Sequence, residues 1–135
     1  MDYYTASGDP SKGLRILVAD GLGERAARLQ ISGKDYCLRV TDNYFMLKSA
    51  LTCNTNWDLL MCSLYFPDKV AVVDELIEAV KSAYHAKRLR GVICTSVLAP
   101  EALKFIRSLK GAKIPAAWMP YDFGVPTKHK EVDVA

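Results

Sequence analysis

Three polar side chains that could carry chemistry lie at or near the C-terminal ends of short apolar runs. They are Asp20, Ser63 and Thr95. If these runs are parallel strands, their carboxyl ends meet at one edge of a sheet, where α/β proteins bind their ligands. We therefore expect Asp20, Ser63 and Thr95 to lie close together. A carboxylate beside two hydroxyls could bind a cation weakly or donate and accept hydrogen bonds.

A glycine turn follows Asp20 and offers a different chemistry. Gly21, Gly23 and Ala26 match the pattern G-x-G-x-x-A between a predicted strand and a predicted helix, and Asp42 lies about 20 residues further on. This is the pattern of a dinucleotide-binding turn. Glu24 weakens that interpretation, because it places a carboxylate where a pyrophosphate would bind. The alternative is a turn that lets strand and helix pack closely.

The cysteines and histidines do not have the spacing of a metal site. No two of the four cysteines are spaced as C-x-x-C, and the two histidines lie far apart in the sequence. Cys37, Cys62 and Cys94 lie in apolar runs, so we expect reduced, buried thiols. No serine–histidine–aspartate triad and no P-loop is supported. We predict no catalytic residue, no metal and no cofactor.

Short apolar runs predict the strands that must position these residues. Several of the runs are nearly continuous rather than alternating, which is typical of strands covered on both faces. The five predicted strands are Leu14–Ala19, Tyr36–Val40, Leu59–Leu64, Gly91–Ser96 and Ala116–Met119.

Segments with helical periodicity separate these strands. The clearest spans Val72–Arg88, with apolar residues at i, i+3, i+4 and i+7. Others are Pro100–Lys110, Leu22–Ile31, and Asn43–Thr52 with Asp42 as the expected N-cap. The alternation of strand and helix predicts an α/β fold with a doubly wound, five-stranded parallel sheet.

Composition indicates one domain without a membrane span. The chain has 135 residues, half of them apolar, and no apolar run approaches the ~20 residues that cross a bilayer. Met1–Gly13 is polar and lacks an apolar leader segment, so we expect a flexible arm and a cytoplasmic protein. The domain is predicted over 14–123, followed by a polar tail at 124–135. A net charge of +3 does not by itself indicate nucleic acid.

The strand ends, taken together, resemble the receiver domain of bacterial response regulators. The resemblance covers about Leu14–Phe123 and implies a CheY/flavodoxin-like fold. Four segments carry it: Leu14–Asp20, Asp58–Pro67, Ile93–Ser96 and Trp118–Tyr121. Three residues keep the type that the family has at its phosphorylation site. Asp20 matches the first magnesium-binding acid, Thr95 the hydroxyl residue, and Pro120 the proline after the lysine.

Four other positions depart from the family pattern. The second acid falls on Gly21, the phosphoacceptor aspartate on Ser63, the lysine on Met119, and the aromatic switch on Ala116. Magnesium needs hard oxygen ligands, and the acyl phosphate needs an attacking carboxylate. The resemblance therefore implies a degenerate receiver in a two-component-type signalling pathway, acting by phosphorylation-independent protein contact. A nucleotide-binding protein or oxidoreductase of Rossmann type remains the alternative.

The C-terminal part of the sequence predicts where a protein partner would bind. After Phe123 the last helix of a receiver is predicted to be reduced or absent, which would leave apolar surface for a homodimer or another protein. The expected interface residues are Phe105, Ala116, Trp118, Tyr121 and Phe123, with core packing as the alternative. The basic stretch 85–90 indicates nucleic acid only weakly, because cations are common at helix C-termini.

Overall fold

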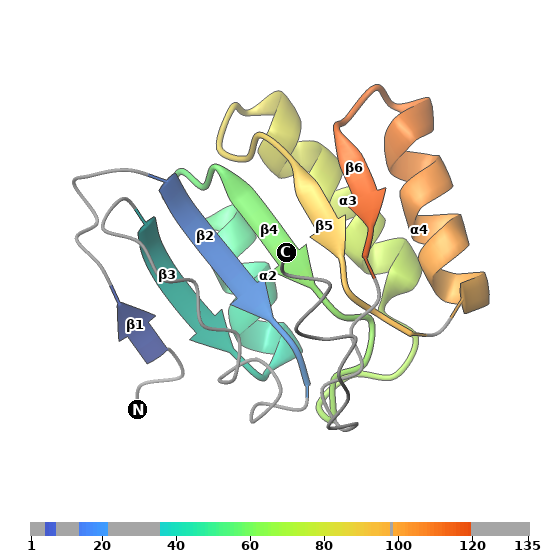
Figure 1. Cartoon of the computed structure of the whole chain (residues 1–135), viewed down its shortest axis with the longest axis horizontal. Coiled ribbons are helices and arrows are strands. Elements are labelled where there is room, and N and C mark those ends of the chain that lie inside the picture. Colours follow the sequence, from blue (N-terminus) through green and yellow to red (C-terminus); the bar gives the residue numbers. More distant parts are fainter. Residues whose placement is uncertain (1–4, 8–13, 22–35, 98, 120–135) are drawn as a thin grey trace, which may run out of the picture.

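The computed structural model describes residues 5–7, 14–21, 36–97 and 99–119 (Figure 1). Five strands form a parallel sheet in the order β3-β2-β4-β5-β6, as in CheY/flavodoxin-like folds. The predicted α/β fold with a five-stranded parallel sheet is therefore confirmed. The strands are β2 (Leu14–Ala19), β3 (Tyr36–Thr41), β4 (Leu59–Cys62), β5 (Val92–Cys94) and β6 (Ala116–Trp118).

A sixth strand was not predicted. Residues Thr5–Ser7 form β1, which pairs antiparallel with β3 at the edge of the sheet. The sequence had assigned these residues to a flexible arm, and for them that prediction is wrong. Three residues of a polar segment carry no periodicity of their own, and the partner strand supplies the backbone hydrogen bonds.

Three described helices connect the strands and cover one face of the sheet (Figure 1). They are α2 (Tyr44–Thr52), α3 (Val73–His85) and α4 (Ala99–Gly111). The N-cap of α2 is Asn43, whose side chain accepts a hydrogen bond from the Met46 N–H, and not the predicted Asp42. The helix predicted for 22–31 and the segment after Phe123 lie outside the described residues. No described helix is long and apolar enough to span a membrane.

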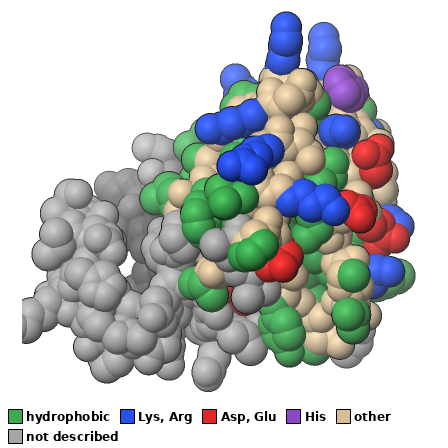
Figure 2. Space-filling model, turned by 90° about the vertical axis from the view of Figure 1, so that its right-hand side faces the viewer, with side chains coloured by type: hydrophobic (Ala, Val, Ile, Leu, Met, Phe, Trp, Pro, Cys, Tyr) green, Lys and Arg blue, Asp and Glu red, His purple; other side chains and the backbone are tan. Residues whose placement is uncertain are grey.

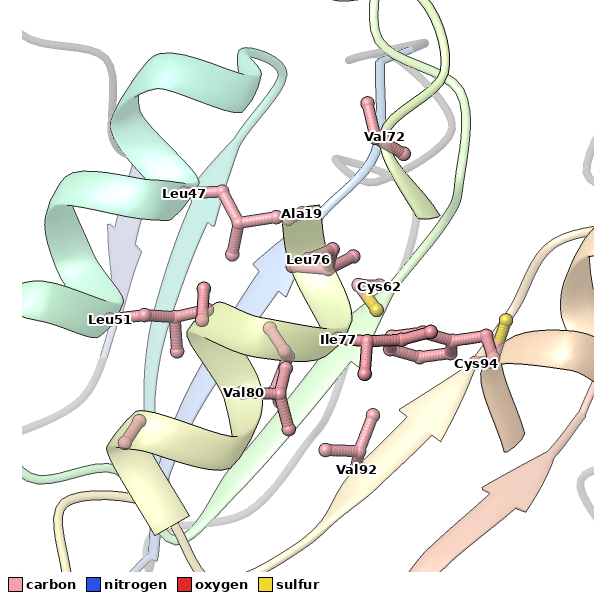
Figure 3. Close-up of a cluster of buried hydrophobic side chains, with 14 of the residues drawn as sticks. Ala19, Leu47, Leu51, Cys62, Val72, Leu76, Ile77, Val80, Val92 and Cys94 are labelled. Atoms are coloured by element: carbon pink, nitrogen blue, oxygen red, sulfur yellow. The ribbon is translucent and has the colours of Figure 1, made fainter. Parts of the chain in front are cut away.

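The main core lies between these helices and the sheet (Figure 3). Leu47 of α2, Leu76 of α3 and Phe105 of α4 are fully buried against inward-facing strand residues such as Leu60. The opposite face of the sheet is apolar too. Its cluster consists of Ile16, Val18, Leu38, Val40 and Met61. The continuous apolar runs thus arise because both faces of the central strands are buried.

Candidate functional site

The predicted site residues form one row at the carboxyl edge of the sheet. Backbone hydrogen bonds run from the Asp20 N–H to the Thr41 carbonyl (3.0 Å), from Ser63 to Ala19 (2.8 Å) and from Thr95 to Cys62 (2.8 Å). Each of the three residues therefore follows its strand by one position. Their side chains are buried, and Asp20 is only 3% exposed. Asp20, Ser63 and Thr95 thus lie at the ends of neighbouring strands along this edge.

Met119 continues this row beyond β5. Its N–H donates to the Cys94 carbonyl (2.8 Å), which places it beside Thr95. The side chain is nevertheless 47% exposed. Almost half of the Met119 side chain therefore faces solvent. Pro120 lies outside the described residues.

The space beside Gly21 is occupied by the chain that follows β4. The Gly21 N–H donates to the Tyr65 carbonyl at 2.9 Å. A Cβ added to Gly21 would lie 2.2 Å from the Tyr65 carbonyl oxygen and 2.7 Å from the Phe66 Cα. Only glycine fits at such a close backbone approach. An acidic side chain in place of Gly21 would require this loop to move.

Ser63 shapes the same loop. Its Oγ accepts a hydrogen bond from the Tyr65 N–H at 3.1 Å, two residues further on. Such serine turns are common where a strand ends. The Ser63 hydroxyl, which the resemblance aligns with a phosphoacceptor, thus has a structural partner and fixes the Tyr65 backbone that closes over Gly21.

Two buried thiols lie beneath the row, on the side that faces α3. Cys62 and Cys94 are register partners on β4 and β5, and both are fully buried. Burial raises the pKa of the Cys62 thiol, and the neighbouring Cys94 and the charge of Asp20 raise it further. Burial raises the pKa of Cys94 to about 11. Both thiols are therefore protonated at neutral pH and are poor nucleophiles, as expected for core cysteines.

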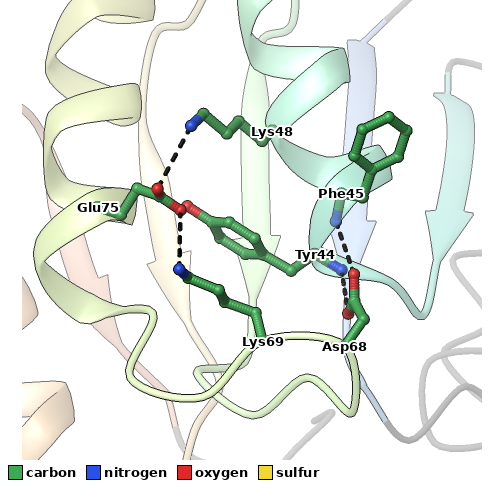
Figure 4. Close-up of polar contacts among 6 residues, drawn as sticks. All are labelled: Tyr44, Phe45, Lys48, Asp68, Lys69 and Glu75. Atoms are coloured by element: carbon green, nitrogen blue, oxygen red, sulfur yellow. Dashed lines mark hydrogen bonds and ion pairs between the residues drawn. The ribbon is translucent and has the colours of Figure 1, made fainter.

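The loop between β4 and α3 is fixed to α2 by Asp68 (Figure 4). Its two carboxylate oxygens accept hydrogen bonds from the Tyr44 N–H (2.8 Å) and the Phe45 N–H (3.0 Å). Burial opposes the charge, but these bonds outweigh it and lower the pKa of Asp68. The carboxylate satisfies two donors at the start of α2 and also complements the positive end of the helix dipole.

Glu75 makes a second connection between α3, α2 and the loop (Figure 4). Its carboxylate forms ion pairs with Lys48 (3.4 Å) and Lys69 (3.9 Å) and faces the buried Tyr44 hydroxyl. Interaction with this hydroxyl, together with the two lysines, lowers the pKa of Glu75. Burial and the same carboxylate raise the pKa of Tyr44. The loop that closes over Gly21 is thus held at several points.

An open cleft of about 600 Å³ lies between this loop and the first turn of α4. Tyr65 and Val70 on its rim are 50% and 88% exposed. Val97 and Met119 add further exposed apolar side chains after β5 and β6. Exposed apolar side chains at one edge of a protein are typical of contact surfaces. We refer to Tyr65, Val70, Val97 and Met119 as the carboxyl-edge surface.

The expected interface around Phe105 is corrected in part. Phe105 is fully buried in the main core and contributes nothing to the surface. Ala116 and Trp118 are partly buried and pack against that core, and the Trp118 indole donates to the Ser96 carbonyl at 2.7 Å. Tyr121 and Phe123 lie outside the described residues. The alternative to an interface role, packing in the core, is correct for Phe105.

The residues of the dinucleotide pattern are placed only in part. Gly21 donates its N–H to Tyr65, so this group is not directed at a ligand. Asp42 is exposed just beyond β3. Gly23 and Ala26 lie outside the described residues. Within the described ranges, no group of three histidine, cysteine or acidic side chains is arranged to hold a metal ion.

Comparison with models of protein families, with curated proteins and with solved structures gives no significant match. The described residues therefore carry the functional interpretation by themselves. Sequence reasoning missed Asp68, Glu75 and the cleft. The available signal was the segment 63–72 between a strand and a helix, since loops positioned by a rigid scaffold often carry functional residues.

Proposed function

We propose that the chain is a receiver-like regulatory domain that acts through protein–protein contact and without phosphotransfer. The observation that carries the proposal is the packing at Gly21. The resemblance aligns Gly21 with the family's second acid. The Tyr65 carbonyl oxygen occupies the space that a side chain at Gly21 would need, and it accepts the hydrogen bond of the Gly21 N–H. The site lies at the ends of parallel strands, as the site of the family does. Backbone atoms of Tyr65 and Phe66 occupy the space that a second acidic side chain would need.

The side chains of the row support the same proposal. Forming an acyl phosphate requires a carboxylate that attacks in line, a magnesium ion and a cation near the phosphoryl oxygens. Ser63 offers a hydroxyl that already accepts a hydrogen bond, and Met119 offers a thioether. Only Asp20 supplies a charge. In this proposal these residues hold the edge of the sheet in shape and do not transfer phosphate.

The partner in this proposal is a protein that covers the carboxyl-edge surface, and we expect a second copy of the chain to be able to do so. Aromatic and aliphatic side chains beside a cleft serve as anchors in interfaces. Val70 is almost fully exposed, and Tyr65 lies on the rim of the same cleft. These residues replace Phe105 as the predicted contact.

Trp118 fluorescence tests whether the site responds to magnesium and beryllofluoride. The Trp118 indole donates to Ser96, next to Thr95, so it reports on the row of strand ends. A Trp57→Phe background removes the other tryptophan, which lies near the opposite edge of the sheet. We expect no change in emission up to millimolar magnesium. A saturable, metal-dependent change would refute a phosphotransfer-independent role.

Sedimentation velocity on the same protein tests the contact. We expect concentration-dependent association that Val70→Lys weakens. Phe45→Lys is the matched control, because Phe45 is also mostly exposed but lies on α2. A protein that stays monomeric at every concentration would exclude the second copy as partner. Equal effects of both substitutions would exclude the carboxyl-edge surface.

A further inference from the structure

Positive charge is concentrated in one part of this protein. Between Lys81 and Lys113 the sequence holds eight lysines and arginines and a single acid, Glu101. The net charge of this segment is therefore +7, although the whole chain carries only +3. The remainder of the chain is net acidic, so charge is distributed unevenly along the sequence in a way that the overall charge conceals.

Four of the eight cations have local structural partners. Lys81 pairs with Glu78, Lys104 with Asp74, and Arg90 with Asp58. The fourth, Arg88, donates to the Leu51 carbonyl at 3.1 Å. These contacts join neighbouring elements and account for these four side chains.

The other four cations have no such partner. Lys87, Arg107, Lys110 and Lys113 are exposed, and none forms an ion pair with another residue in the described part of the chain. Arg107 and Lys110 lie one turn apart on α4, while Lys87 and Lys113 follow the C-terminal ends of α3 and α4. Figure 2 shows lysine and arginine side chains over the upper part of the side formed by α4 and β6. We call these four residues the amino-edge basic surface.

Two of these lysines occupy positions that favour glycine. Lys87 has φ of 63° and Lys113 has φ of 62°, both in the left-handed region. In each turn the residue donates to the carbonyl three positions back, and the next residue donates to the carbonyl five positions back. This is the Schellman motif, in which glycine is the usual residue at that position. Backbone strain is therefore present at two turns, and an exposed lysine lies at each of them.

We propose that the amino-edge basic surface binds the sugar–phosphate backbone of nucleic acid without reading its sequence. Interfaces between proteins are depleted in lysine and anchored by aromatic residues, whereas interfaces with nucleic acid are strongly positive. The described segment that carries these four cations, 81–113, has no exposed phenylalanine, tyrosine or tryptophan side chain. Lysine and arginine contacts to phosphate position a protein on nucleic acid but do not read base edges.

Salt dependence gives this proposal a quantitative test. Four phosphate contacts predict that log K for duplex DNA falls with log salt at a slope of about −3.6, or about 150-fold in affinity between about 50 and 200 mM salt, and that the slope for a single strand is about −2.8. The measurement is fluorescence anisotropy of a labelled DNA duplex of about 20 base pairs and of a single-stranded RNA of equal length. The full chain is used throughout.

The decisive variant is Lys87→Gly with Lys113→Gly. Glycine relieves the strain at both turns, so we expect a more stable protein that binds more weakly, with a slope of about −1.8 and a loss of about 12-fold over the same salt range. Lys48→Gln with Lys69→Gln removes two charges elsewhere. Ala71→Gly relieves the third positive φ, 57°, without changing charge. Both control proteins are expected to keep the wild-type slope.

Three results would overturn the proposal. The first is no salt-dependent binding to either nucleic acid. The second is the same change of slope in the Lys48 and Lys69 control, which would mean that net charge alone is responsible. The third is equal binding to poly-glutamate of matched charge, which would assign the surface to acidic proteins. Because all three concern the amino edge, they leave the Trp118 experiment unaffected.

Discussion

Gly21→Ala probes the closest backbone approach in the protein. The added Cβ would lie 2.2 Å from the Tyr65 carbonyl oxygen and 2.7 Å from the Phe66 Cα. Both are backbone atoms, so no side-chain rotation can make room. The loop that carries them is also held by Asp68, through hydrogen bonds to the first turn of α2. The methyl group must therefore either separate β2 from the loop or distort both.

Two contributions determine how much Gly21→Ala reduces the free energy of unfolding. The hydrogen bond from the Gly21 N–H to Tyr65 would lengthen or break, which is worth about 1 kcal/mol. Inserting a methyl group into a packed region costs roughly 1–3 kcal/mol more. We therefore expect Gly21→Ala to reduce the free energy of unfolding by about 2–4 kcal/mol. That is a large part of the roughly 5–15 kcal/mol typical of a domain.

Urea denaturation followed by tryptophan fluorescence measures this loss. With a slope near 2 kcal/mol per molar, the midpoint should fall by about 1–2 M. Gly91→Ala and Gly111→Ala are matched controls. The nearest atom to a Cβ at Gly91 is 3.6 Å away, and none lies within 4 Å at Gly111. If Gly21→Ala lost no more stability than these two, the loop would not be closed over Gly21.

Two further predictions concern packing and pH. Asp68→Ala should cost about 1 kcal/mol, because two N–H groups at the start of α2 lose their acceptor. The pKa of Asp68 is lowered in the folded protein, so its contribution is complete above the unfolded value of about 3.9 and is lost as pH falls through the folded value. Urea titrations should therefore converge for wild type and variant in acid. Phe105→Ala should reduce the free energy of unfolding by about 3–5 kcal/mol, as for a core aromatic. A reduction below about 1 kcal/mol would indicate that Phe105 is not part of the core.

The sequence could predict the parallel sheet because its central strands leave a strong signal. Strands buried on both faces must be nearly continuously apolar, as β2 is from Ile16 to Ala19 and β4 is over its whole length. β1 leaves no such signal, because a three-residue edge strand depends on hydrogen bonds to β3 and on little else. The α2 cap was misplaced by one residue. Asp42 and Asn43 are both good N-caps, and only the backbone decides between them.

The site was predictable where it depends on strand order and unpredictable where it depends on the loop. Asp20, Ser63 and Thr95 had to converge once the strands were parallel. The contact of Tyr65 with Gly21 and the capping by Asp68 join residues far apart in the sequence, and no local pattern encodes them. Phe105 was different, since its helical spacing with Ile106 and Leu109 already placed it on the buried stripe of α4.

The two proposed surfaces lie at opposite ends of the sheet, and this separation makes their functions independent. Helix α3, whose 13 residues span about 20 Å, separates Val70 from Lys87, and this length exceeds the Debye length of roughly 8 Å at physiological salt. The charges at Lys87 and Lys113 therefore have little electrostatic influence on a partner bound around Val70. Under the two proposals, the chain would hold nucleic acid at its amino edge while a protein occupies its carboxyl edge. A regulator with both contacts could bring that protein to nucleic acid without any phosphoryl chemistry.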